Sequence, residues 1–220
     1  MSINKNNSKL KKNSDIAVPR EVKNKVTLRI ENVVASVKVG TFIDLNKLLE
    51  KYKDIEKKEN FPGLVVKMKN PKATILIFSS GKMVATGVRL VKHLPIVVEK
   101  VVKKMENAGI EIEMEPEVKI ENIVVRGDFH QTINLDLTSL SLTRAIYEPE
   151  VFPGLIYKIP DPKICFLIFS SGRIICTGAS DENIIRSSVK KLALDLKRQG
   201  VLGNTKKKVG QLDLDLLDLF

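Results

Sequence analysis

The chain contains one long motif twice, and this duplication limits the folds that it can adopt. Residues 61–87 and 152–178 align without gaps, and 15 of the 27 positions are identical. Both copies begin with Phe-Pro-Gly-Leu, continue through Leu-Ile-Phe-Ser-Ser-Gly and end with Thr-Gly. Solenoid repeats have a period of about 20–50 residues, whereas these copies lie 91 residues apart. The sequence therefore predicts two half-domains with pseudo-twofold symmetry, which suits a partner with its own twofold symmetry, such as duplex DNA.

The charge of the chain is compatible with a polyanionic partner. The 220 residues carry a net charge of +11. Residues 1–25 contribute +5 and residues 203–220 are neutral, so residues 26–202 keep +6. A basic body fits nucleic-acid binding, although many lysine-rich proteins bind no nucleic acid. The hydrophobic content of 43% is that of an ordinary globular core.

The sequence shows no targeting segment and no cofactor motif. The sequence has no run of about 18 apolar residues that could cross a membrane. Its N-terminal residues lack the apolar core of a signal peptide. We therefore expect an intracellular protein. Cys165 and Cys176 correspond to Thr74 and Ala85 in the first copy, which indicates buried thiols and neither a disulfide nor a metal site. We expect no cofactor, no small-molecule substrate and no membrane partner.

Periodicity predicts the same order of elements in residues 26–113, the first repeat, and in residues 114–202, the second. Each repeat is expected to hold a strand, a short helix, a three-stranded meander and a long helix, which makes an α+β fold. The predicted segments are strand 26–37, helix 44–50, strands 63–69, 73–79 and 82–88, helix 89–108, strand 118–126, helix 135–146, meander 154–178 and helix 181–199. Pro95 is expected to kink the start of its helix. Residues 1–25 read as a disordered basic arm and residues 203–220 as a flexible Lys/Leu-Asp tail.

One strand in each meander is apolar on both faces. Side chains alternate between the two faces of a strand, so Leu76 and Phe78 point one way while Ile75 and Ile77 point the other, and residues 164–169 repeat the pattern. If helices cover one face, the other remains open, and a large exposed apolar face marks a binding surface. A sandwich or barrel that covers both faces is the alternative.

Two kinds of polar side chain recur on otherwise apolar strands. Asn32 and Asn122 occupy equivalent β-branched segments, where asparagine is unfavourable, and Thr86 and Thr177 recur likewise. An apolar face with central amides and hydroxyls matches the minor groove of DNA, which offers sugar edges and the acceptors of A·T pairs. Basic residues around such a face would meet phosphates. The candidates for these contacts are Lys67, Lys82, Arg89, Lys158 and Arg173.

Phenylalanines recur in pairs. Phe61 precedes one strand of the first meander and Phe78 ends the next strand, so the two rings can meet at the same end of the sheet. Phe152 and Phe169 form the copy. Aromatic wedges of this kind enter base steps and kink the duplex. Burial in the core is the alternative, which the position of Phe78 on the Leu76 face disfavours.

With these motifs, residues 26–202 resemble the TATA-binding protein family. The resemblance rests on the repeated Phe-Pro-Gly-Leu, Leu-Ile-Phe-Ser-Ser-Gly-[Lys/Arg] and Thr-Gly, together with the paired Asn-[Val/Ile]-Val, and the Phe-Pro-Gly form looks archaeal. It implies a saddle: a curved, ten-stranded antiparallel sheet with four helices on the convex face. It also implies a general transcription factor, not an enzyme, that binds the minor groove of the TATA box and recruits transcription factor B and RNA polymerase. Such a protein would be cytoplasmic and nucleoid-associated in an archaeon, and nuclear in a eukaryote.

The resemblance assigns roles residue by residue. The intercalating wedges correspond to Phe61, Phe78, Phe152 and Phe169. The base-contacting amides and hydroxyls correspond to Asn32, Asn122, Thr86 and Thr177. The apolar groove floor corresponds to Val34, Leu76, Val84, Val124, Leu167 and Ile175, and the phosphate contacts to the five basic residues named above. The contacts with transcription factor B correspond to Glu148, Glu150 and Val151.

The sequence departs from the family pattern, and other functions stay open. Ser180 stands where the family has a basic residue, and segment 56–60 lacks the Tyr-Glu-Pro-Glu of residues 147–150. An RNA-binding or architectural protein could use the same sheet, but its aromatics would stack on bases in mid-strand. An enzyme would need a catalytic constellation, and His93 and His130 have no symmetric partners. A homodimer formed through the concave face is a further expectation.

Overall fold

The computed structural model describes residues 26–205, and its centre is one antiparallel sheet of ten strands. From one edge to the other the strands are β2 (Ile55–Lys57), β3 (Leu64–Lys69), β4 (Lys72–Ile77), β5 (Lys82–Val88), β1 (Thr27–Lys38), β6 (Glu117–Asp128), β11 (Arg173–Ala179), β10 (Ile164–Phe169), β9 (Gly154–Ile159) and β8 (Ala145–Ile146). The first repeat supplies one half of this order and the second repeat the other half.

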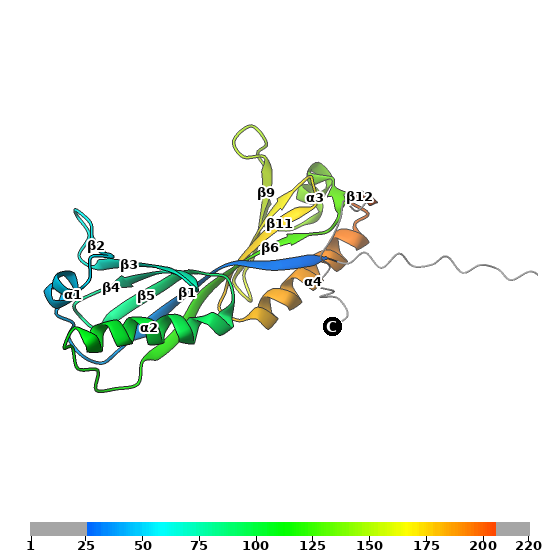
Figure 1. Cartoon of the computed structure of the whole chain (residues 1–220). Coiled ribbons are helices and arrows are strands. Elements are labelled where there is room, and N and C mark those ends of the chain that lie inside the picture. The colour runs from blue at the N-terminus through cyan, green and yellow to red at the C-terminus, as the bar shows by residue number, and fades with distance from the viewer. Residues whose placement is uncertain (1–25, 206–220) are drawn as a thin grey trace, which may run out of the picture.

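Four α-helices accompany the sheet. They are α1 (Leu45–Lys51), α2 (Leu94–Asn107), α3 (Leu135–Ser141) and α4 (Glu182–Arg198), and a 3-10 turn, η1 (Val91–His93), precedes α2. Figure 1 shows the sheet bowed, with α2 and α4 along its convex side and a loop rising at each end. The predicted α+β saddle with an internal duplication is confirmed. A sandwich or barrel is excluded for the residues that the structure describes.

β1 and β6 join the two repeats in the middle of the sheet. Val33 lies opposite Ile123, its own equivalent in the other repeat. Asn32 lies opposite Val124, and Val34 lies opposite Asn122. The pseudo-twofold axis therefore passes between Val33 and Ile123, and the two predicted asparagines flank it.

The convex side of the sheet carries the core. In β4, Ile75 and Ile77 are 2% and 1% exposed, while Leu76 on the opposite face is half-buried. The long helices bury apolar residues at three- and four-residue spacing. These are Leu94, Val97, Val98, Val101 and Met105 in α2, and Ile185, Val189, Leu192 and Leu196 in α4. Within residues 26–205 no element covers the concave face (Figure 1).

The repeated Ser-Ser-Gly closes a tight turn in each half. Gly81 and Gly172 have φ angles of 79° and 85°, in the left-handed region. A Cβ atom at Gly81 would collide with the carbonyl oxygen of Thr41, and one at Gly172 with that of Gln131. Both the backbone conformation and the close approach therefore require glycine.

The structure corrects the predicted helices at their ends. The helix predicted over 89–108 begins at Leu94, and Pro95 does not kink it, because proline in the first turn lacks only an N–H that has no intrahelical acceptor. The helix predicted over 135–146 ends at Ser141. Arg144 then adopts a positive φ of 68°, and residues 145–146 join the sheet edge as β8.

Four short strands were not predicted. β2 and β8 form the two edges of the large sheet, and β7 (Gln131–Ile133) pairs with β12 (Leu202–Thr205) in a separate two-stranded sheet. Residues 203–205 were assigned to the flexible tail, and this is wrong because they belong to β12, whose Thr205 lies opposite Gln131 of β7. The rest of that tail, residues 206–220, and the basic arm, residues 1–25, lie outside the described residues.

Candidate nucleic-acid interface

The concave face has an apolar floor built from matched positions of the two repeats. Its six predicted members, all half-buried, are Val34, Leu76, Val84, Val124, Leu167 and Ile175. Leu76 pairs with Val84 across β4 and β5, as Leu167 pairs with Ile175 across β10 and β11. Ile156, opposite Leu167 in β9, extends the floor, and strand alternation could have identified it. The structure thus brings all six predicted floor residues onto one face.

The asparagine of the first repeat is held by the neighbouring strand. Asn32 Oδ1 accepts a hydrogen bond from the Gly87 N–H at 2.7 Å and lies 3.3 Å from Thr86 Oγ1. The pairing of β1 with β5 is irregular at this point, so the side chain satisfies a backbone donor that the bulge leaves without a ladder partner. The predicted pair of Asn32 and Thr86 therefore forms one cluster.

The second repeat builds the same cluster. Asn122 Oδ1 accepts a hydrogen bond from the Gly178 N–H at 3.0 Å, and Asn122 Nδ2 donates to Thr177 Oγ1 at 3.0 Å. The side chains of Asn122 and Thr177 are only partly buried on the concave face. Because an amide nitrogen has two hydrogens, each asparagine keeps a donor for a ligand on this face.

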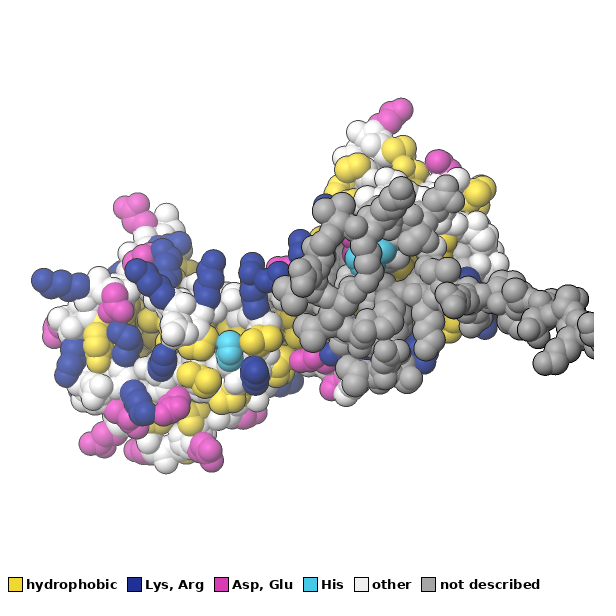
Figure 2. Space-filling model, turned by 45° about the vertical axis from the view of Figure 1, so that its right-hand side comes forward, with side chains coloured by type: hydrophobic (Ala, Val, Ile, Leu, Met, Phe, Trp, Pro, Cys, Tyr) yellow, Lys and Arg dark blue, Asp and Glu magenta, His cyan; other side chains and the backbone are white. Residues whose placement is uncertain are grey.

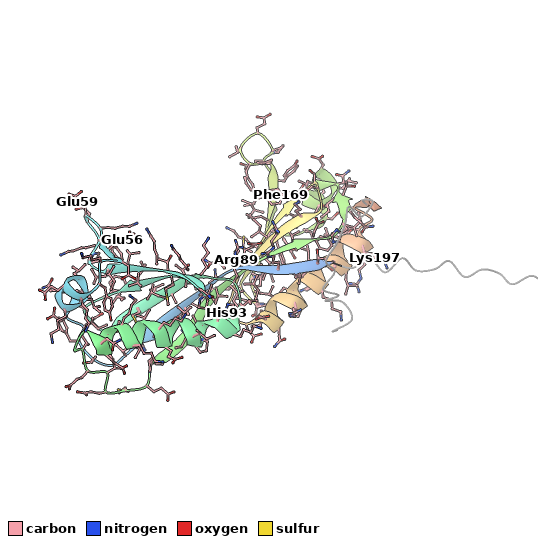
Figure 3. All side chains as sticks on the ribbon, in the orientation of Figure 1. Glu56, Glu59, Arg89, His93, Phe169 and Lys197 are labelled. Atoms are coloured by element: carbon pink, nitrogen blue, oxygen red, sulfur yellow. The ribbon has the colours of Figure 1, made fainter. Side chains whose placement is uncertain are left out.

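Two phenylalanine pairs stand at the outer parts of the face. In Phe61–Phe78 the ring centroids are 5.6 Å apart, and in Phe152–Phe169 they are 6.0 Å apart, both edge to face. A glycine adjoins each pair, and a Cβ atom at Gly63 or Gly154 would come within 3.1 Å of both rings. This contact explains the repeated Phe-Pro-Gly. Phe169 is labelled in Figure 3, near the loop that leads into β9.

The five predicted phosphate contacts are all exposed. Lys67 Nζ lies 2.8 Å from Glu56 Oε1, and this hydrogen bond lowers the pKa of the Glu56 carboxyl. Exposed ion pairs of this kind contribute little to stability, so a phosphate could replace Glu56 as the partner of Lys67. The other four are Lys82, Arg89, Lys158 and Arg173.

Positive charge is concentrated in the first repeat. Residues 26–113 hold 16 Lys/Arg and 10 Asp/Glu, a net charge of +6, whereas residues 114–202 hold 11 of each and are neutral. Figure 2 shows Lys and Arg side chains spread over the part of the surface formed by the first repeat. The two repeats thus have the same fold but differ in net charge.

A glutamate shared by three arginines lies beside the centre of the face. Arg29 Nε and Arg126 Nε lie 4.0 Å and 3.5 Å from Glu31 Oε1, and Arg89 Nη2 lies 3.6 Å from Glu31 Oε2. The Glu31 side chain is only 28% exposed. Sequence reasoning found Arg89 but missed Arg29 and Arg126. Strand alternation outward from Asn122 could have placed Arg126 on this face.

The loop of residues 147–151 projects from one end of the sheet. The Glu148 carbonyl accepts hydrogen bonds from the Val151 N–H at 3.0 Å and from the Phe152 N–H at 2.9 Å. This tight turn leaves Glu148 and Glu150 exposed and Val151 80% exposed. The three predicted partner contacts therefore lie together on one accessible tip.

Besides the concave face, residues 26–205 contain two cysteines and two histidines. No group of His, Cys, Asp and Glu side chains in this range could hold a metal ion. Cys165 and Cys176 are free thiols, and burial raises the pKa of Cys176 to about 12. His130 Nε2 lies 3.0 Å from Thr27 Oγ1, and His93 belongs to η1. None of the helices described here is long and apolar enough to cross a bilayer.

Known proteins match both repeats of the chain. The family model described as "Transcription factor TFIID (or TATA-binding protein, TBP)" matches residues 27–108 and 117–199. The chain belongs to the TATA-binding protein family. The two matched segments correspond to the two halves of the internal duplication, so the resemblance expected from the motifs is confirmed.

Members of the TATA-binding protein family from archaea are similar over most of the chain. The TATA-box-binding protein of Pyrobaculum islandicum is 44% identical over 177 residues, which are 80% of this chain and 89% of that protein. That of Pyrococcus furiosus is 41% identical over 183 residues, or 81% and 94% of the two chains. The solved structure of Methanococcus jannaschii TBP superposes with a TM-score of 0.72 at 39% identity, covering 78% of this chain and 98% of that one.

Proposed function

We propose that this member of the family is a general transcription factor that binds the minor groove of an A·T-rich TATA box through its concave face. One observation carries the proposal: the face consists of two matched half-surfaces around a pseudo-twofold axis. Each half-surface has an apolar floor, an Asn–Thr cluster and a phenylalanine pair. Duplex DNA has the corresponding symmetry.

The chemistry of the face favours A·T pairs. In the minor groove these pairs present only acceptors, whereas a G·C pair adds the amino group of guanine. Asn32 and Asn122 would donate to acceptors near the axis, and the apolar floor would lie against sugar edges. A guanine amino group placed on that floor would lose its hydrogen bonds to water. The exposed lysines and arginines would neutralise phosphates and make binding dependent on salt.

The phenylalanine pairs would act as wedges at the two ends of the site. Rings inserted into base steps unstack them and kink the duplex toward the major groove, a mode of which this family is itself an example. The pairs contact one another edge to face at the outer parts of the sheet, so each would enter a different step. A kinked duplex would follow the curvature of the concave face.

The loop of residues 147–151 would contact transcription factor B through Glu148, Glu150 and Val151, and the resulting complex would recruit RNA polymerase. The protein performs no catalysis in this scheme and needs no cofactor. It would act in the compartment that holds the DNA. Without DNA, the apolar concave face would be the surface through which two copies associate.

A gel-shift titration tests the specificity of binding. We expect at least about tenfold tighter binding to a TATA-box duplex than to a G·C duplex of equal length, and a further shift when transcription factor B is added. Equal affinity for the two duplexes would contradict specific binding. Stronger binding to single-stranded RNA would favour the RNA-binding alternative.

Fluorescence transfer between the two ends of a labelled TATA duplex tests the wedges. We expect the double variant Phe152→Ala/Phe169→Ala to reduce bending at saturating protein, because one kink loses its wedge. Ile96→Ala is the matched control, since Ile96 is an exposed apolar residue on α2, which lies on the convex side. An unchanged bend in the double variant would rule out intercalation by this pair.

A further inference from the structure

The two halves of the concave face differ chemically at one matched position beside the axis. Arg126 follows Asn122 by four residues in β6, as Ser36 follows Asn32 by four residues in β1. Arg126 lies opposite Ile175 of β11, and Ser36 lies opposite Val84 of β5. Each therefore adjoins the apolar floor of its own half, one as a guanidinium group and the other as a hydroxyl.

The neighbouring glutamates gather different partners as a result. Glu31 lies within 4.0 Å of Arg29, Arg89 and Arg126, a cluster of formal charge +2. The equivalent Glu121 accepts a 2.7 Å hydrogen bond from Ser36 Oγ and pairs with Lys119 Nζ at 3.3 Å. Glu121 and Lys119 together have a formal charge of zero. The face is therefore more basic on one side of the axis.

The two side chains also differ in what they can recognise. A guanidinium group only donates hydrogen bonds, whereas a serine hydroxyl both donates and accepts. Opposite a G·C pair, Arg126 would set its donors against the guanine amino group, while Ser36 could accept from that group.

Glu31 positions Arg126 for such contacts. The contact is made through Nε at 3.5 Å, and the guanidinium group carries four more N–H donors on its two Nη atoms. The Arg126 side chain remains 57% exposed. The shared carboxylate also offsets the repulsion that three neighbouring guanidinium groups would otherwise have.

We propose that Arg126 is a specificity-determining residue. The half of the bound duplex that faces Arg126 must consist of A·T pairs alone, whereas the half that faces Ser36 accepts a G·C pair. This difference orients the protein on an asymmetric DNA site. The inference rests on the proposed function, because it presupposes that the concave face binds the minor groove.

The test measures orientation with the full chain. The parent protein carries two substitutions. Cys165→Thr, which introduces the residue found at this position in the first copy, leaves buried Cys176 as the only native thiol. Glu59→Cys, in the loop of the first repeat, carries a donor dye. The DNA is an A·T-rich duplex with one G·C pair in one half and an acceptor dye at one end or the other. We expect complexes with the first repeat over the G·C half to outnumber complexes in the reverse orientation by at least about fivefold.

The exchange Ser36→Arg/Arg126→Ser keeps composition and net charge, and we expect it to invert this ratio. Arg126→Lys, which still only donates, should preserve the ratio, and Arg126→Ser alone should bring it close to one. The inference would be overturned if the exchange left the ratio of the two orientations unchanged. It would also be overturned if the parent protein bound the duplex in both orientations equally. If the chain without any of these substitutions fails to bind even an all-A·T duplex, the proposed function itself fails.

Discussion

At the scale of single residues, the central asparagines do two things with one side chain. The Oδ1 atom of Asn32 accepts a hydrogen bond from the Gly87 N–H at the bulge of β5, while its Nδ2 group, which lies 3.3 Å from Thr86 Oγ1, keeps a second hydrogen for a ligand on the concave face. The fold uses the acceptor and the proposed DNA contact uses the donor. The two uses can therefore be separated by a change that alters only one of them.

Asn32→Asp makes that separation. We expect its free energy of unfolding to fall by less than about 1 kcal/mol, because the carboxylate still accepts from Gly87 and Thr86. Binding to a TATA duplex should weaken at least about tenfold, because the donor is lost and a negative charge faces the groove. Thermal unfolding and fluorescence anisotropy measure the two effects.

Asn32→Ala is the control for this pair of measurements. It removes the acceptor as well as the donor, so unfolding should become easier by about 1–3 kcal/mol. If Asn32→Asp bound DNA as tightly as the parent chain, the amide would have no role in recognition.

At the scale of elements, alternation along β4 and β10 let the sequence predict which face is open. The edge strands β2 and β8 could not be predicted in this way, because two or three residues are too few to show a period. Their pairing depends on the neighbouring strands β3 and β9. Arg126 escaped prediction for another reason: the best-matched segment of the duplication, residues 61–87 and 152–178, does not include β6.

The two cysteines lie on opposite faces of the sheet, in the neighbouring strands β10 and β11. Cys165 in β10 lies on the concave face and is half-buried, whereas Cys176 in β11 is buried in the core. Burial raises the pKa of Cys176 to about 12, so at pH 8 this thiol stays protonated and unreactive. We expect iodoacetamide to modify only Cys165 in the folded protein and both cysteines in guanidinium.

Mass spectrometry of the alkylated protein measures this outcome. A saturating TATA duplex should slow the modification of Cys165, because the concave face would then be covered. Rapid labelling of Cys176 in the folded chain would contradict the assignment of its face.

At the scale of the whole molecule, the ladder between β1 and β6 couples the two repeats. Its paired residues run from Thr27–Asp128 to Lys38–Glu117, so neither half of the sheet keeps its central hydrogen bonds if the other unfolds. Residues 26–205 should therefore unfold as one cooperative unit.

Leu192→Ala tests this coupling from within the second repeat. Leu192 is fully buried in α4, and its truncation should cost about 2–5 kcal/mol. We expect calorimetry to show one transition moved to lower temperature, and not a separate early transition of the second repeat. Leu194→Ala, on the exposed side of the same helix at 47% exposure, should change stability by no more than about 0.5 kcal/mol.

The axis between Val33 and Ile123 relates the two repeats as it would relate the subunits of a symmetric dimer. A single repeat paired with a copy of itself would rebuild the same ladder, with Asn32 of one copy opposite Val34 of the other, as Val34 now lies opposite Asn122. The chain thus has the form of a homodimer whose two subunits are covalently linked through residues 108–116. Two identical subunits can never carry arginine on one side and serine on the other. Because both repeats belong to one polypeptide, the two halves of the face can differ.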